Sequence, residues 1–73
     1  MDKEAEQLSK GVAAKVRPAY QKSLKQGGDA SQAYSRAYDK VVELVAQAQH
    51  ISVEKARFAS RDVLQEAMAL VTQ

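Results

Sequence analysis

Gly27 and Gly28 form the one strong break in a sequence that is otherwise poor in residues that interrupt helices. The chain has 73 residues with three glycines and one proline, and it is rich in alanine, glutamine, lysine and glutamate. This balance favours helix over sheet, because few positions offer breakers or β-turn chemistry. Two adjacent glycines end a helix easily, since the left-handed backbone conformation costs glycine little. The sequence therefore predicts an all-α fold with a first helix that ends at this break.

Residues suited to helix N-caps divide the chain further. Asp2 can cap a first helix, Asp29 follows the glycines as a good N-cap, and Ser52 can cap a third helix. We therefore predict one domain, residues 1–73, because the chain is long enough for one only. Its predicted helices are about 3–26, 30–49 and 53–71.

Pro18 lies inside the first predicted helix. A proline there removes one backbone hydrogen bond and clashes with the carbonyl four residues back. We expect this helix to kink near residues 14–17 or to break into two pieces. The predicted fold is thus a three-helix bundle or a helical hairpin with a kinked N-terminal helix, possibly dimeric.

Apolar residues recur at helical spacing in the second and third predicted helices. In the second, a heptad seam consists of Ala30, Tyr34, Ala37, Val41, Leu44 and Ala48, with a flank of Tyr38, Val42 and Val45. In the third, the seam consists of Val53, Ala56, Ser60, Val63, Ala67 and Leu70, flanked by Leu64, Met68 and Val71. The wide stripe on the second helix can contact two neighbours, which predicts that this helix is central.

The flank of the second helix also suggests self-association. A monomer can cover Tyr38 and Val42 only with the first helix, and a break at Pro18 would leave a short piece for that purpose. The remaining apolar area would favour a two-fold homodimer of helical hairpins, with Phe58 at its edge. The alternative is a closed monomeric bundle in which a straighter first helix does all the covering.

The first predicted helix separates cations from apolar side chains. Its apolar side carries Leu8, Val12, Val16, Ala19, Tyr20 and Leu24. Its basic side carries the candidate partner-binding residues Lys10, Lys15, Arg17, Lys22 and Lys25. Residues 1–28 hold six basic and three acidic side chains, whereas residues 29–73 hold five basic and six acidic ones. Such segregation bears on partners rather than on fold.

Four interpretations of this basic side remain open. It can be a solvated surface that keeps a small protein soluble. It can neutralise several phosphates in salt-sensitive, sequence-independent binding, although no aromatic residue among the cations supports base stacking. It can dock an acidic partner protein through electrostatic steering. An anionic membrane surface is least supported, because the apolar side carries no Trp or Phe.

Phe58 lies away from the seam of the third predicted helix and is the only phenylalanine in the chain. Its helical neighbours are Glu54, Lys55, Arg61, Asp62 and Gln65. Either the first helix packs there and buries the ring, or the ring is an exposed anchor for a partner or a second copy. Aromatic and arginine side chains in such settings are typical hot spots of protein interfaces.

The sequence carries no readable active site, so we predict a protein that is not an enzyme and has no cofactor. There is no cysteine and a single histidine, His50, in a predicted turn, so neither the usual zinc ligands nor a histidine-activated serine is expected. The glycines do not form a phosphate-binding loop. The second and third helices have the order of a DNA-reading helix-turn-helix. However, their turn lacks glycine and the basic residues of the third helix alternate with acidic ones.

These observations favour a small non-enzymatic regulatory or adaptor protein that binds another protein through helix faces. The alternative is a nucleic-acid-binding accessory protein that uses the basic side of the first helix. The N-terminus is polar, and no apolar window approaches the roughly 18 residues of a membrane span, which predicts a cytoplasmic protein.

Overall fold

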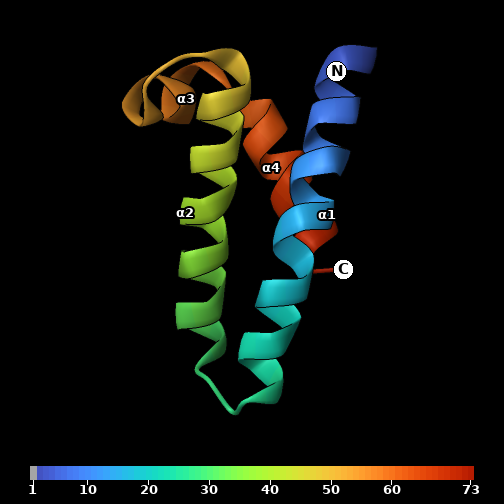
Figure 1. Cartoon of the computed structure of the whole chain (residues 1–73), viewed down its shortest axis with the longest axis vertical. Coiled ribbons are helices and arrows are strands. Elements are labelled where there is room, and N and C mark those ends of the chain that lie inside the picture. Colours follow the sequence, from blue (N-terminus) through green and yellow to red (C-terminus); the bar gives the residue numbers. More distant parts are fainter. Residues whose placement is uncertain (1) are drawn as a thin grey trace.

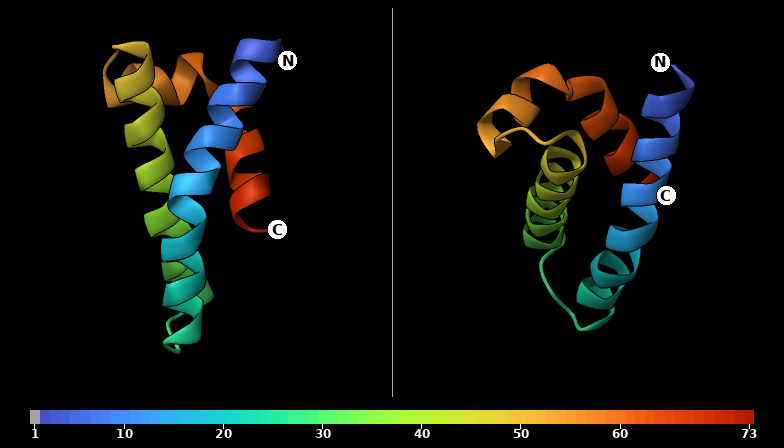
Figure 2. Two further views of the ribbon diagram at one scale, coloured as in Figure 1. Left: turned by 45° about the vertical axis from the view of Figure 1, so that its right-hand side comes forward. Right: turned by 45° about the horizontal axis from the view of Figure 1, so that its top comes forward.

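The computed structural model describes residues 2–73, which form four α-helices and no β-strand (Figure 1). The helices are α1 (Lys3–Lys25), α2 (Ala30–Gln49), α3 (Val53–Ala59) and α4 (Arg61–Val71). α1 and α2 form a long antiparallel hairpin, and α4 packs against both of them. The short α3 lies at the end of α2 that is remote from the hairpin turn (Figure 2). The predicted all-α fold is confirmed, as a compact packing of helices.

The three predicted N-caps all form. The Asp2 carboxylate accepts a hydrogen bond from the backbone N–H of Ala5 at 2.8 Å. Asp29 and Ser52 accept comparable bonds at the starts of α2 and α3. Each bond satisfies one of the backbone donors that the first turn of a helix leaves unpaired. The helix starts are therefore determined locally, as the sequence predicted.

Left-handed residues follow the first two helices. Gly27 has a φ of +79°, so the glycine pair ends α1 as predicted. His50 has a φ of 57° and caps α2, and the following N–H of Ile51 donates to the carbonyl of Ala46 at 3.1 Å. This pattern is a common way to end a helix. His50 is exposed, so its role in the fold is that of a turn residue.

α1 continues through Pro18 without interruption, so the expectation of two separate pieces is wrong. Pro18 and Ala14, whose carbonyl loses its partner, are both exposed, and water can therefore satisfy that carbonyl. The helix axis changes direction around its middle (Figure 2, left view), as the kinked alternative predicted. The buried residues of α1 all precede Pro18, and after it the half-buried Tyr20 packs against the core.

The predicted helix 53–71 is divided at Ser60, which has a φ of −118° and a ψ of 31°. Ser60 is buried, and its hydroxyl donates to the side-chain oxygen of Gln49 at 2.5 Å. The N–H of Leu64 still donates to the carbonyl of Ser60 at 3.0 Å, so the division is a bend without a loop. No glycine or proline marks it, because the bend follows from a contact with α2 rather than from local propensity.

The core lies where α1, α2 and α4 meet. Its larger buried residues are Val12, Val16, Val41, Val42, Val45, Leu64, Met68 and Val71. In α2, Ala37 and Val41 of the predicted seam are buried together with Val42 and Val45 of the flank. The other seam residues Ala30, Tyr34 and Ala48 are exposed. The buried stripe of α2 is therefore shifted from the predicted seam toward the flank, and α2 contacts α1, α3 and α4.

This packing buries part of the surface on which the dimer prediction rested. Val42 is fully buried and Tyr38 is half-buried within a single chain. α2 contacts α1, α3 and α4, so α1 is not the only helix that can cover its flank. Val42 is therefore unavailable as a self-association residue unless the fold opens. The oligomeric state itself stays a prediction.

Candidate interaction surfaces

Phe58 is exposed to 82%, more than any other large hydrophobic side chain in residues 2–73. α1 does not cover it, so the interpretation in which the first helix buries this ring is wrong. Ala56, two residues earlier, is fully buried, and two helical steps of about 100° place Phe58 roughly opposite to it. The inward position of Ala56 therefore leaves Phe58 on the outer side of α3.

Arg57 holds α3 against α2. Its guanidinium lies 5.8 Å from the ring centre of Tyr38 and 3.5 Å from the carboxylate of Asp39. The first contact is a cation–π interaction and the second an ion pair. Tyr38, a predicted partner-binding residue, is thus engaged within the chain. Arg61, the other predicted residue near Phe58, is exposed at the start of α4.

The five predicted cations of α1 are all exposed, and four of them divide between two sides of the helix. Lys10 and Arg17 line a groove between α1 and α4, where Arg17 donates to the backbone carbonyl of Gln73 at 3.3 Å. Lys15 lines a different groove, between α1 and α2. Lys22 follows Lys15 by seven residues, or two helical turns, and therefore lies on the same side. The basic side is thus not one surface.

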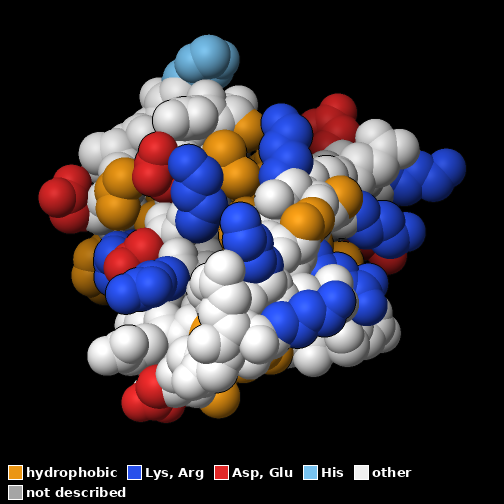
Figure 3. Space-filling view, turned by 60° about the horizontal axis from the view of Figure 1, so that its bottom comes forward, with side chains coloured by type: hydrophobic (Ala, Val, Ile, Leu, Met, Phe, Trp, Pro, Cys, Tyr) orange, Lys and Arg blue, Asp and Glu red, His pale blue; other side chains and the backbone are white. Residues whose placement is uncertain are grey.

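α2 adds two cations that the sequence analysis missed. Arg36 and Lys40 line a small groove between α1 and α2 that also includes Ser23 of α1. We call Lys15, Lys22, Arg36 and Lys40 the α1–α2 basic surface. Figure 3 views the molecule from the hairpin end, where Lys and Arg side chains extend across much of the visible face. A helical wheel treats one helix at a time and therefore misses a surface built from two.

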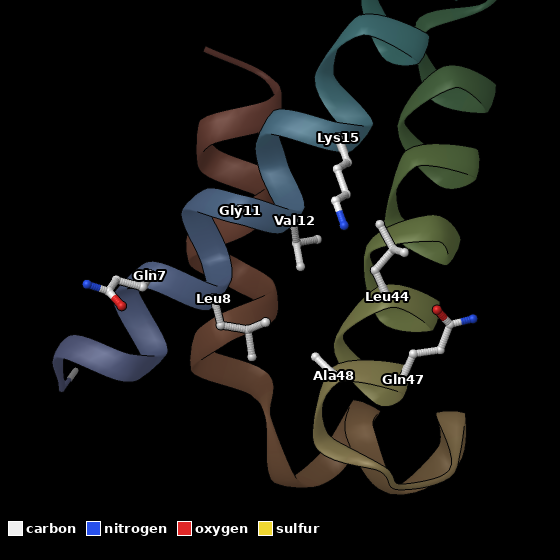
Figure 4. A pocket seen from close by; sticks show the side chains of 8 residues that line it. All are labelled: Gln7, Leu8, Gly11, Val12, Lys15, Leu44, Gln47 and Ala48. Atoms are coloured by element: carbon white, nitrogen blue, oxygen red, sulfur yellow. The ribbon is translucent and has the colours of Figure 1, made fainter.

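A larger groove, of about 380 Å³, lies between α1 and α2 (Figure 4). Its main lining residues are Leu8, Gly11, Val12, Lys15, Leu44 and Ala48. In Figure 4, Leu8, Val12 and Leu44 point into the space between the two helices, and the ribbon of α4 lies behind them. Leu8 and Leu44 are only half-buried. We call this feature the α1–α2 groove.

Residues 2–73 contain no group of three or more His, Asp or Glu side chains placed to hold a metal ion. Within the same residues, no helix has both the length and the apolar character needed to cross a membrane. Comparison with known proteins finds no matching family model, no similar curated protein and no similar solved structure. The interaction surfaces are therefore the basis for any functional argument.

Proposed function

We propose that this chain is a small non-enzymatic adaptor or regulator that binds another protein, with Phe58 as an anchor. The observation that carries this proposal is the 82% exposure of Phe58 on a helix that Arg57 fixes to α2. Aromatic side chains that fill a pocket of a partner dominate the binding energy of many interfaces.

The exposed ring contributes little to the stability of the fold. Burying a phenylalanine side chain is worth about 1.5–3 kcal/mol, and this gain is not realised at Phe58 within the chain. A partner that covers the ring would realise it. Because Arg57 already orders α3, binding would also lose less conformational entropy than it would with a flexible segment.

Affinity capture from a cell lysate tests the proposal when wild type and Phe58→Ser are compared, with and without nuclease. We expect a captured protein that survives nuclease and is lost with Phe58→Ser, while circular dichroism shows unchanged folding. Leu24→Ser is the matched control, because Leu24 is 39% exposed on α1 at the opposite end of the hairpin. Equal capture by wild type and Phe58→Ser would refute the role of Phe58.

A nucleic-acid-binding accessory protein is the second candidate, and the α1–α2 basic surface favours it. Lys15 lines one cavity between α1 and α2, and Arg36 and Lys40 line another. Lys40, however, lies 3.7 Å from Glu43, which neutralises part of this charge. A phosphate binder loses affinity steeply as salt rises, with a slope of about 0.9 per phosphate contact in a log–log plot. Titration with a short DNA duplex at several salt concentrations therefore separates the two candidates.

A further inference from the structure

The α1–α2 groove lies on the side of the hairpin opposite α4. α1 and α2 bury their inner residues against α4, and within residues 2–73 no helix covers their other side (Figure 4). Leu8 and Leu44 are half-buried and face this open side. A further helix laid along the groove would bury them and give a four-helix packing, which is a stable way to arrange helices.

Gly11 has no role within the chain that requires a glycine. It lies inside α1, where glycine is destabilising relative to alanine. A Cβ placed on Gly11 would have no neighbour within 4 Å. The missing side chain leaves a flat position on the wall of the groove, which allows another backbone to approach closely.

The charge around the groove differs between its two ends. Asp2 and Glu4 line the adjoining cavity that shares Leu8 and Ala48 with the groove, and the cations lie toward the hairpin turn. Lys15 lines the groove, Arg36 and Lys40 line the second cavity between α1 and α2, and Lys22 lies two helical turns after Lys15 on α1. The ion pairs formed by side chains of residues 2–73 are Lys40–Glu43 and Arg57–Asp39. Lys15, Lys22 and Arg36 therefore have no acidic partner within that part of the chain. An occupant with acidic side chains would supply one.

We infer that the α1–α2 groove binds an amphipathic helix of another protein, with an apolar stripe flanked by Asp or Glu. Such helices use apolar anchors at every third or fourth residue to fill a groove of this kind. A phosphate backbone has no apolar groups that would use Leu8 and Leu44. A second copy would have to present an apolar stripe, but the exposed large hydrophobics of residues 2–73 are Leu24, Tyr34, Val53 and Phe58, spread over three helices.

Synthetic peptides of about 18 residues, or five helical turns, test this inference. The first carries a leucine stripe flanked by glutamate, the second replaces each glutamate with lysine, and the third scrambles the stripe. Each is titrated into the full chain while backbone amide shifts are recorded. We expect the glutamate peptide to shift the amides of Leu8, Gly11, Leu44 and Ala48. The lysine and scrambled peptides should bind at least about tenfold more weakly.

Two variants connect binding to the groove. Gly11→Leu fills it with a side chain that meets open space in the free protein, so folding should persist while peptide affinity falls at least about tenfold. The matched control is Ala14→Leu, at an exposed position of α1 that lines the groove toward α4 instead. Lys15→Glu combined with Arg36→Glu should reverse the preference, so that the lysine peptide binds better.

Several results would overturn the inference. One is a glutamate peptide that binds no better than the scrambled one or shifts the amides of α3 instead. Another is a concentration-dependent shift of the groove amides without peptide, which would assign the groove to a second copy. A third is stronger perturbation of the same amides by a DNA duplex. Shifts on α3 would point to the surface around Phe58 instead of the groove, and the proposed function is tested separately by the Phe58→Ser capture experiment.

Discussion

Val42→Ala tests whether the flank of α2 is part of the core of a single chain. Val42 is 0% exposed, and the substitution removes two methyl groups, worth about 1.6 kcal/mol of transfer free energy. The cavity left behind raises the loss to about 2–3 kcal/mol. Alanine has a higher helix propensity than valine, which returns at most about 0.7 kcal/mol. The expected net loss is about 2 kcal/mol.

This loss is large for a chain of this length. A domain of 73 residues has a free energy of unfolding of about 4–11 kcal/mol, and 1 kcal/mol corresponds to about 4–8 °C in Tm. Urea unfolding and thermal melts, followed by far-UV circular dichroism, measure the change. Val53→Ala is the matched control, because Val53 is 39% exposed at the start of α3 and should change stability by less than about 0.5 kcal/mol.

Two results would refute the reasoning. If Val42→Ala is as mild as Val53→Ala, then Val42 is not part of the buried core. If the wild type sediments as a dimer and the loss from Val42→Ala falls away at high protein concentration, then a second copy contributes to the cover of Val42. Sedimentation equilibrium of the wild type, with the 8.0 kDa chain mass as reference, thus also decides the homodimer prediction.

Two backbone predictions accompany this one. Pro18→Ala should raise the free energy of unfolding by about 1–3 kcal/mol in thermal melts, because α1 already runs through Pro18 and the variant regains one backbone hydrogen bond. A clear loss of stability would show that the bend is needed for packing. Gly27→Ala should lower stability by about 1–2 kcal/mol in urea, because its φ of +79° is unfavourable for a residue with a side chain. Gly11→Ala is the control for this variant and should gain about 1 kcal/mol of stability. If Gly27→Ala leaves stability unchanged, the left-handed turn at Gly27 is contradicted.

Features of the fold that depend on neighbouring residues were predictable from the sequence. Asp2, Asp29 and Ser52 cap helices through bonds to residues two or three positions away. The bend at Ser60 was not predictable, because it depends on Gln49, eleven residues earlier in the chain. The phase of α2 was also ambiguous, since α2 carries apolar residues on more than one side. The packing of α4, which no pattern within α2 encodes, selects the side that contains Val42.

For the candidate surfaces too, features within one helix were predictable and features that depend on packing between helices were not. A helical wheel identified Phe58 as lying off the seam but left its exposure open, because exposure depends on where α1 packs. The wheel of α1 grouped Lys15 with Arg17, although they face different grooves. Arg36 and Lys40 are four residues apart and therefore lie on one face of α2. This spacing was the only sign in the sequence that they could share a basic surface. Their relation to Lys15 follows only from the hairpin.

The exposure of Phe58 follows from the contacts on both sides of it in the sequence. The Ser60–Gln49 hydrogen bond turns the chain between α3 and α4, and the Arg57–Asp39 ion pair holds α3 against α2. With Ala56 inward and Arg57 along α2, the helical geometry leaves Phe58 no position except the outer side. Ala56 is the one buried residue within the seven of α3, so these polar contacts, rather than a local core, order the segment. A partner that covers Phe58 would supply the apolar burial that α3 lacks, and binding would therefore stabilise α3 itself.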